Sequence, residues 1–278
     1  MGAVAFLFAG QGAQVPGMAS DVKDVPKVKK LFDLAEGIAP GVVAKMLGGT
    51  QEELNRTLLT QPTMFLADLA YAYAKEEELG APACACGFSV GEVPALCFAG
   101  ALSEEDAFRA IVKRAELMEA YTQRVAGCML AVVKLPADKV EALCDNVNTH
   151  PANYNGALQT VVACRAEAEE AFTAKVKEAG GRAMKLRVSG MFHCPELAPE
   201  AAAFEEFLRT LGWRAPRLPV YANLTAQPYE GDFAHTLALQ MCSPVRFTAT
   251  VANMRAAGVD TFVEVGPGKV LTGLVERG

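Results

Sequence analysis

The stretch ACACGFSVG at residues 83–91 decides the fold, because it joins a short strand to a helix through a glycine-rich turn. Its first four residues are small and apolar, as in a buried strand, and helical patterns follow at 90–98 and 104–124. The two glycines of the turn permit a sharp bend and keep bulk away from Ser89. Backbone N–H groups at the start of the next helix favour an oxyanion beside the serine. The stretch therefore predicts that Ser89 is a catalytic nucleophile.

Strand and helix patterns alternate on both sides of this stretch. An apolar run at 3–8 ends in a glycine-rich turn, and two further strands are predicted at 220–223 and 261–265. Alternating strands and helices are typical of a parallel sheet with helices on its faces, so we expect an α/β fold. Further helical patterns lie at 25–36, 51–56 and 62–78.

The pattern changes in the middle of the chain, where segments follow in the order β-α-β-β-α-β. This order predicts a small ferredoxin-like subdomain at 126–190, inserted in a large catalytic subdomain made of 1–125 and 191–278. The strand pattern at 153–164 should contain both central strands of this order, but the sequence does not show where one ends and the next begins. A long helix is expected to follow, from His193 to about Leu211. The other predicted segments of the small subdomain lie at 127–135, 137–146, 167–179 and 183–188.

The composition suits a large buried core and excludes several classes of protein. Of 278 residues, 51% are hydrophobic and 21% are charged, enough for an α/β domain with an inserted lobe. The net charge of −6 lacks the excess of Lys and Arg that sequence-independent nucleic-acid binding needs, and the N-terminal apolar run is too short to span a bilayer. The eight cysteines stand in apolar runs without zinc spacing, which indicates reduced, buried thiols. We expect no metal, cofactor, nucleic-acid or membrane partner.

A serine nucleophile needs a base, and the chain has three histidines. His150 precedes a proline and His235 lies in a polar stretch, so both are predicted on the surface. His193 follows a predicted strand at the start of a turn and is the strongest candidate for the base. Arg114 lies inside a predicted helix, where a solvated charge is the ordinary interpretation.

The assembled motifs resemble the malonyl-CoA:acyl carrier protein transacylases of dissociated, type II fatty acid synthesis, and the likeness covers nearly the whole chain. It implies an α/β-hydrolase-like large subdomain and an S-malonyltransferase. Such an enzyme moves malonyl from coenzyme A to the phosphopantetheine thiol of acyl carrier protein through a malonyl-serine intermediate, by a ping-pong mechanism. The matching segments are FAGQG at 8–12, TQP at 60–62, GFSVGE at 87–92, KRAELM at 113–118, NYN at 153–155, VSGMFH at 188–193, QMCSPV at 240–245 and EVGPG at 264–268.

The resemblance also assigns catalytic roles to single positions. It makes Ser89 the acylated nucleophile and His193 its base. Gln240 matches the residue whose carbonyl oxygen orients the histidine, a neutral substitute for the aspartate of a triad. Gln11 and Val90 match the positions whose backbone N–H groups form the oxyanion hole.

Substrate selection is assigned in the same way. Arg114 matches the arginine that binds the free carboxylate of malonyl, and a guanidinium can do so through two parallel hydrogen bonds that lysine cannot copy. Phe192 matches a position where an aromatic ring accompanies preference for malonyl over branched acyl groups. Other positions that match the substrate pocket are Gln61, Met118, Asn153 and Asn155.

Two residues depart from the commonest pattern. Phe88 stands where many bacterial members have histidine, as in mitochondrial-type members, and Cys194 stands where a small hydroxyl residue is common. A thiol so near the site is expected to be sensitive to alkylation. The implied partners are malonyl-CoA and acyl carrier protein, and the chain is expected to act as a monomer. We expect it in the cytoplasm or, in a eukaryote, in the mitochondrial or plastid matrix, and no targeting peptide is recognised.

Carrier proteins are generally acidic, so basic residues are the natural docking candidates. A solvated helix and strand face is the alternative interpretation of the same residues. The candidates on the small subdomain are Lys175, Lys177, Arg182, Lys185 and Arg187.

Two other functions share parts of this pattern. A serine hydrolase would have the same turn, histidine and oxyanion hole, but would normally carry an acidic residue between the serine and the histidine. In this chain Gln240 follows His193, which is the order of the transferases. A non-catalytic subunit that binds a carrier protein would keep the fold without the chemistry.

Overall fold

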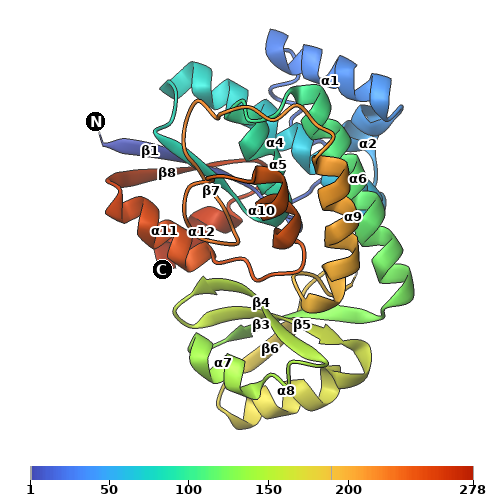
Figure 1. Cartoon of the computed structure of the whole chain (residues 1–278), viewed down its shortest axis with the longest axis vertical. Coiled ribbons are helices and arrows are strands. Elements are labelled where there is room, and N and C mark those ends of the chain that lie inside the picture. Colours follow the sequence, from blue (N-terminus) through green and yellow to red (C-terminus); the bar gives the residue numbers. More distant parts are fainter. Residues whose placement is uncertain (1, 189, 278) are drawn as a thin grey trace.

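The computed structural model describes residues 2–188 and 190–277, and its strands form two separate sheets (Figure 1). Ser189, part of one motif quoted above, lies outside the described residues, as do Met1 and Gly278. The larger sheet is parallel with the strand order β7-β2-β1-β8. Its strands are β1 (Ala3–Phe8), β2 (Cys84–Gly87), β7 (Val220–Tyr221) and β8 (Val259–Val265).

Helices cover both faces of the parallel sheet because side chains alternate along β1. Phe6 and Phe8 pack in the large core with α1, α4, α5, α6, α9 and α10, while Ala5 and Leu7 pack on the other face with α11 and α12. The helices of this part are α1 (Pro26–Ile38), α2 (Val42–Gly48), α3 (Gln51–Leu54), α4 (Thr57–Leu79), α5 (Glu92–Phe98), α6 (Glu104–Arg124), α9 (Ala198–Leu208), α10 (Phe233–Gln240), α11 (Phe247–Ala256) and α12 (Val270–Arg277).

The smaller sheet is antiparallel, with the strand order β4-β5-β3-β6, and lies at the bottom of Figure 1. Leu130 and Val132 of its central strand pack against Phe172 and Val176 of α8. The opposite face of the sheet turns toward the larger part, where Met129 joins the main core. The elements are β3 (Gly127–Val133), α7 (Ala137–Leu143), β4 (Thr149–Gly156), β5 (Gln159–Arg165), α8 (Glu169–Glu178) and β6 (Arg182–Lys185).

The structure confirms the α/β prediction and corrects several segments. The stretch predicted at 153–164 is two strands, β4 and β5, because a turn at residues 157–158 separates them and the first strand begins already at Thr149. The helix predicted from His193 to about Leu211 is present as α9, but its predicted start is wrong. The backbone of His193 has a positive φ of 58°, which cannot continue a helix, and α9 begins only at Ala198.

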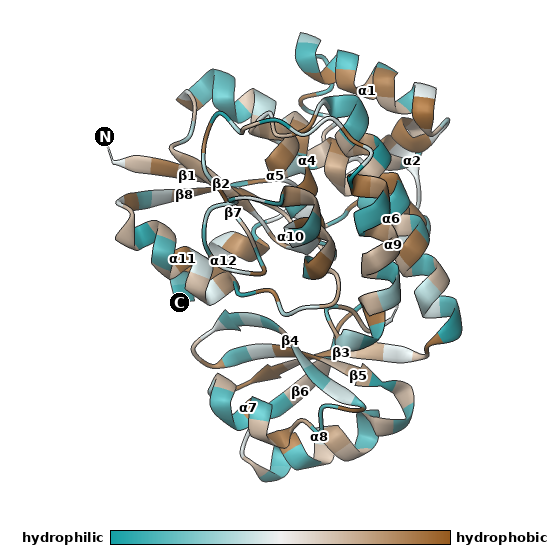
Figure 2. Cartoon of the chain, viewed as in Figure 1, coloured by the Kyte–Doolittle hydropathy of each residue, from teal (hydrophilic) through white to brown (hydrophobic). Residues whose placement is uncertain are grey.

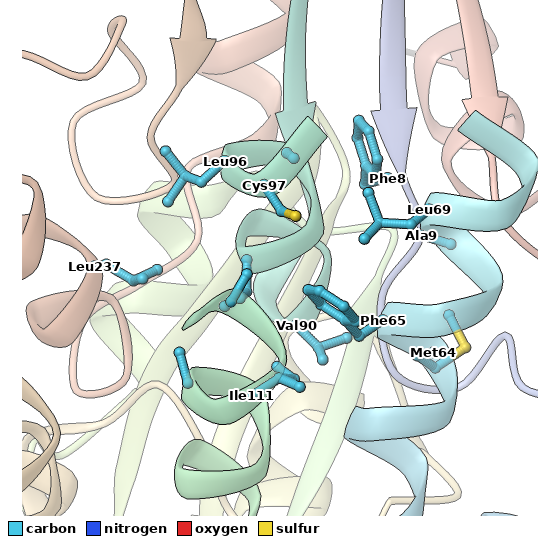
Figure 3. Packing of buried hydrophobic residues seen from close by; sticks show 14 of the residues in the cluster. Phe8, Ala9, Met64, Phe65, Leu69, Val90, Leu96, Cys97, Ile111 and Leu237 are labelled. Carbon is cyan, nitrogen blue, oxygen red and sulfur yellow. The ribbon is translucent and has the colours of Figure 1, made fainter. Parts of the chain in front are cut away.

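The packing of the core fixes the turn that follows β2. Figure 2 shows hydrophobic residues along β1 and hydrophilic residues along the length of α6. In Figure 3, the side chain of Val90 lies in the core with Phe65 and Ile111, so the residue after Ser89 is anchored by burial. Within residues 2–188 and 190–277, no helix is both long and apolar enough to cross a membrane.

Candidate active site

Ser89 lies on a sharply bent turn between β2 and α5. Its φ is +53°, a left-handed conformation that costs energy in a residue with a β-carbon and marks a functional constraint. A β-carbon at Gly87 would overlap the backbone of Gly91, and one at Gly91 would overlap the carbonyl oxygens of Phe8 and Ala9 at the end of β1. Both glycines are therefore required by close packing of backbone on backbone.

Asn223 holds this turn from the neighbouring strand end. Its side-chain oxygen accepts the Ser89 N–H at 2.7 Å, and its side-chain nitrogen donates to the Gly87 carbonyl at 2.6 Å. One amide thus satisfies two backbone groups of the turn, which stabilises the strained conformation. Nothing in the local sequence around residue 223 predicts this contact.

Ser89 and His193 lie in direct hydrogen-bond contact, although 104 residues separate them in sequence. The distance between Ser89 Oγ and His193 Nε2 is 2.7 Å, and that between His193 Nδ1 and the backbone carbonyl oxygen of Gln240 is 2.9 Å. A carbonyl only accepts, so Nδ1 carries the proton and Nε2 is left to accept from the serine. Burial, together with repulsion by Arg114, lowers the pKa of His193 to about 4. The imidazole is therefore a neutral base at neutral pH.

Arg114 is buried behind the nucleophile, 1% exposed, which corrects its interpretation as a solvated helix charge. Its Nη1 donates to Gln61 Oε1 at 2.7 Å, and its Nη2 donates to Gln240 Oε1 at 2.9 Å and to Ser89 Oγ at 3.4 Å. Among the described side chains, its Nε has no hydrogen-bond partner. Burial lowers the pKa of Arg114 to about 10, so the guanidinium stays charged at neutral pH.

A buried carboxylate, which sequence analysis missed as a functional residue, lies under the same turn. Glu92 is fully buried at the start of α5, and its oxygens accept hydrogen bonds from the Tyr229 hydroxyl, from Gln240 Nε2 at 2.7 Å and from the Asn223 N–H at 3.2 Å. Burial raises the pKa of Glu92 to about 7. The signal was present in the GFSVGE motif, but nothing in that motif indicates what the carboxylate contacts.

Ser89 lines a cavity of about 580 Å³, whose other walls include the small sheet and the loops that follow β1 and β2. Gln61 and Arg114 are not among the residues that line the cavity. Gln61 Nε2 donates at 3.2 Å to the sulfur of Met118, which does line it. Val90 is buried in the core beside Ser89. The sequence-predicted residues that line the cavity are Gln11, Ser89, Met118, Asn153, Asn155, Phe192 and His193.

The two departures from the common pattern have distinct surroundings. Phe88 lines the cavity and packs edge-on against Phe247, with 5.5 Å between the ring centroids. Cys194 is fully buried, its sulfur lies 3.7 Å from the Tyr121 hydroxyl, and burial raises its pKa to about 12. A buried thiol with so high a pKa is a poor nucleophile, which argues against the expected sensitivity to alkylation.

The other histidines do not line the cavity. His150 is buried in β4, with Nε2 3.3 Å from a Glu196 carboxylate oxygen, which corrects its predicted surface position. His235 is exposed near the start of α10, as predicted, and its Nδ1 lies 3.0 Å from Glu205. All eight cysteines are free thiols and six of them are buried, as predicted.

Comparisons with known proteins agree with this geometry. Residues 5–278 match the acyl transferase domain family. The chain is 35% identical to the malonyl CoA-acyl carrier protein transacylase of Bacillus subtilis, covering 100% of this chain and 90% of that protein. It is also 35% identical to the polyketide biosynthesis protein ThaF of Burkholderia thailandensis, covering 98% of this chain but 24% of that protein.

A solved structure of MCAT from Streptococcus pneumoniae superimposes with a TM-score of 0.93 at 35% identity, covering 99% of this chain and 92% of that one. The agreement in fold extends over both sheets, since nearly the whole chain is matched. Sequence and structure therefore both show that the chain belongs to the malonyl-CoA:acyl carrier protein transacylase family of acyl transferases.

Proposed function

We propose that Ser89 carries the malonyl group when this malonyl-CoA:acyl carrier protein S-malonyltransferase moves it from coenzyme A to the phosphopantetheine thiol of acyl carrier protein in fatty acid biosynthesis. The observation that carries this proposal is a serine 2.7 Å from a neutral histidine and 3.4 Å from a buried guanidinium. The histidine suits nucleophilic catalysis, and the guanidinium suits an acyl group with a free carboxylate.

In the first half-reaction, Ser89 Oγ attacks the thioester carbonyl of malonyl-CoA while its proton passes to His193 Nε2. The backbone N–H groups of Gln11 and Val90 stabilise the oxyanion of the tetrahedral intermediate. Collapse of the intermediate breaks the carbon–sulfur bond, and the leaving coenzyme A sulfur takes the proton from His193. Malonyl-Ser89 and neutral coenzyme A thiol remain.

The second half-reaction runs the same steps with the carrier protein. Its phosphopantetheine thiol gives a proton to His193 Nε2 and attacks the ester carbonyl of malonyl-Ser89. The oxyanion again forms beside the same two backbone amides, and the ester bond to Oγ breaks. Ser89 recovers its proton from His193, so the enzyme returns to its starting state.

Arg114 selects acyl groups that carry a carboxylate. Its Nη1 and Nη2 donate to the side-chain oxygens of Gln61 and Gln240, and the malonyl carboxylate competes for these donors. An acetyl group supplies no anion to this buried cation, so the charge is left without a partner. Phe192 lines the cavity and crowds an α-methyl group.

The cavity walls suit the arm of the substrate. Asn153 and Asn155 of β4 line it, and among the described side chains Asn155 Oδ1 is buried without a hydrogen-bond partner, so it can accept an amide N–H of pantetheine. Arg187 and Arg277 line the cavity as exposed cations, which suits the phosphates of coenzyme A.

We assign the subdomains by the same logic. The small antiparallel sheet has the order β4-β5-β3-β6 with α7 and α8 in its crossings, which supports a ferredoxin-like subdomain at 126–190. A nucleophile on the turn after a parallel strand supports an α/β-hydrolase-like large subdomain at 1–125 and 191–278. We further propose that the enzyme acts as a monomer. The relatives named above are bacterial, which favours a bacterial cytoplasm over an organelle matrix.

Intact-protein mass spectrometry tests this function directly. After mixing with malonyl-CoA, the wild type is expected to gain one malonyl group, and Ser89→Ala is expected to gain none. Holo-acyl carrier protein should remove the group much faster than water does. Equal loss with and without carrier protein would indicate a hydrolase, and full pathway activity in Ser89→Ala would indicate a non-catalytic subunit.

The same measurement with acetyl-CoA and methylmalonyl-CoA tests the selection of the acyl group. An acetyl adduct formed as readily as the malonyl adduct would contradict the role of Arg114.

A further inference from the structure

Glu92 is a fully buried carboxylate behind Ser89 that none of the steps above uses. Its Oε2 accepts from Gln240 Nε2 at 2.7 Å and from the Asn223 N–H at 3.2 Å, and its Oε1 accepts from the Tyr229 hydroxyl. A carboxylate in the core is costly unless its hydrogen bonds are made, and here two donors come from the loop at 222–229 and a third from Gln240 at the end of α10. The arrangement is therefore a built network around Glu92.

The side chain of Gln240 connects this network to Arg114. Its Nε2 donates to Glu92 Oε2 at 2.7 Å and to the Ser89 carbonyl at 2.9 Å, while its Oε1 accepts from Arg114 Nη2 at 2.9 Å. An amide has one donating and one accepting end. Because the Ser89 carbonyl only accepts and Arg114 only donates, the amide fits this site in one orientation.

We propose that Glu92 is a positioning residue for carboxylate recognition: by holding the donating end of the Gln240 amide, it directs the amide oxygen to Arg114 and keeps the guanidinium beside Ser89. This inference rests on the proposed function, because it concerns the arginine that selects malonyl. Glu92 does not contact the cavity, so it acts on the substrate only through Gln240 and Arg114.

The network predicts different effects for two substitutions of Glu92. Glu92→Leu removes both acceptors, so the Gln240 amide and Arg114 lose their fixed positions. Glu92→Gln keeps an oxygen for Gln240 and Asn223 if its new NH₂ group faces Tyr229, whose hydroxyl can accept instead of donate. We therefore expect Glu92→Gln to rescue most of the function that Glu92→Leu loses.

The readout is the preference for malonyl, taken as the ratio of kcat/KM for Ser89 acylation by malonyl-CoA to that by acetyl-CoA. Losing a hydrogen bond to a charged group should lower this ratio by about tenfold to a hundredfold in Glu92→Leu. In Glu92→Gln the ratio should stay within about threefold of wild type. If Glu92→Leu lowered kcat/KM equally for malonyl-CoA and acetyl-CoA, the role of Glu92 would be merely structural, and the proposal would be overturned. An equal loss of preference in the two variants would overturn it too.

Glu200 offers a matched control. It is a buried carboxylate on α9 that pairs with Arg124 and does not line the cavity. Glu200→Leu removes a buried acid of the same size, so it should reduce stability without changing the malonyl-to-acetyl ratio. A similar change of ratio in this variant would show that any buried carboxylate has the effect, and would overturn the specific role of Glu92.

A second variant tests the proposal even where Glu92→Leu does not fold. Gln240→Leu removes the amide but keeps the backbone carbonyl that accepts from His193, so acylation by malonyl-CoA should fall more than acylation by acetyl-CoA, and the malonyl-to-acetyl ratio should fall with it. Unchanged preference in Gln240→Leu would overturn the proposal. Failure of the proposed function looks different: the wild type itself would then not distinguish malonyl-CoA from acetyl-CoA.

Discussion

At the scale of single residues, charges placed around Ser89 determine its reactivity. His193 is buried beside the cation of Arg114, and both burial and that charge disfavour its protonated form. Its tautomer is fixed by a backbone carbonyl rather than by an acid, so no carboxylate stabilises the imidazolium directly. The base is therefore available over a wide range of pH, at the cost of a less stable protonated intermediate.

This arrangement predicts an acid limb of activity near pH 4. The pKa of His193 is lowered from 6.5 to about 4, so the neutral base persists until the pH falls toward that value. The same shift makes the folded state lose stability as the pH falls below about 6.5, since the unfolded chain binds the proton more readily. The rate at which a neutral sulfonyl fluoride inactivates Ser89, followed against pH, measures the limb without a titrating substrate.

Arg114→Gln is the informative comparison for that measurement. Removing the nearby positive charge should move the acid limb to higher pH, because repulsion of the imidazolium is one cause of the low pKa. A limb at or above pH 6.5 in the wild type would contradict the assignment of His193 as a buried, neutral base.

At the scale of elements, the nucleophile turn depends on how closely β2, α5 and the loop after β1 approach one another. A β-carbon at Gly91 would meet the carbonyl oxygens of Phe8 and Ala9, and these backbone atoms cannot move aside as a flexible side chain could. The turn is therefore held by sterics on one side and by Asn223 on the other.

Gly91→Ala is expected to destabilise the fold and reduce acylation together. Overpacking against backbone should cost about 1–3 kcal/mol or more in the free energy of unfolding, measured by urea denaturation. Gly37→Ala is the matched control, because Gly37 lies near the end of α1 with open space around its Cα. There the same substitution should be neutral or stabilise by up to about 1 kcal/mol. Wild-type stability in Gly91→Ala would contradict the close approach.

At the scale of the whole molecule, the cavity is lined by strands of the small sheet and by the loops that follow β1 and β2 of the large one. Docking must bring a carrier protein to the opening of this cavity. The net charge of −6 repels an acidic partner at long range, so a local basic surface has to provide the attraction. Lys177 of α8 and Arg182 of β6 are exposed, whereas Lys185 is paired with Glu169 at 2.7 Å and Arg187 lines the cavity itself.

Charge reversal at two of these positions tests the docking surface. Lys177→Glu with Arg182→Glu should raise the KM for acyl carrier protein several-fold, and more at low salt, while the KM for malonyl-CoA stays unchanged. Lys29→Glu with Lys30→Glu makes the same change of charge on α1, at the opposite end of the molecule (Figure 1), and serves as the control. Equal effects on both substrates, or equal effects of both pairs, would contradict the surface.

Much of the site was predictable because residues close to Ser89 in sequence set the conformation of its turn. The glycines around Ser89 act on backbone atoms within a few residues, so the turn can be read from the motif. The same local reasoning failed at His193, where a predicted helix is replaced by a left-handed residue, and at His150, which a longer β4 buries. In both cases contacts with distant segments decided the backbone.

By itself, the sequence determined the α/β fold, because periodicity and glycine sterics operate over short distances along the chain. It also predicted Ser89 as the nucleophile and His193 as its base. Only the tertiary structure decided that Arg114 is a buried cation, that the Gln240 side chain accepts from it, and that Glu92 accepts from the Gln240 amide. The physical reason is that burial and charge pairing depend on which segments meet in space. Glu92 and Gln240 are 148 residues apart in sequence, and no local pattern records their contact.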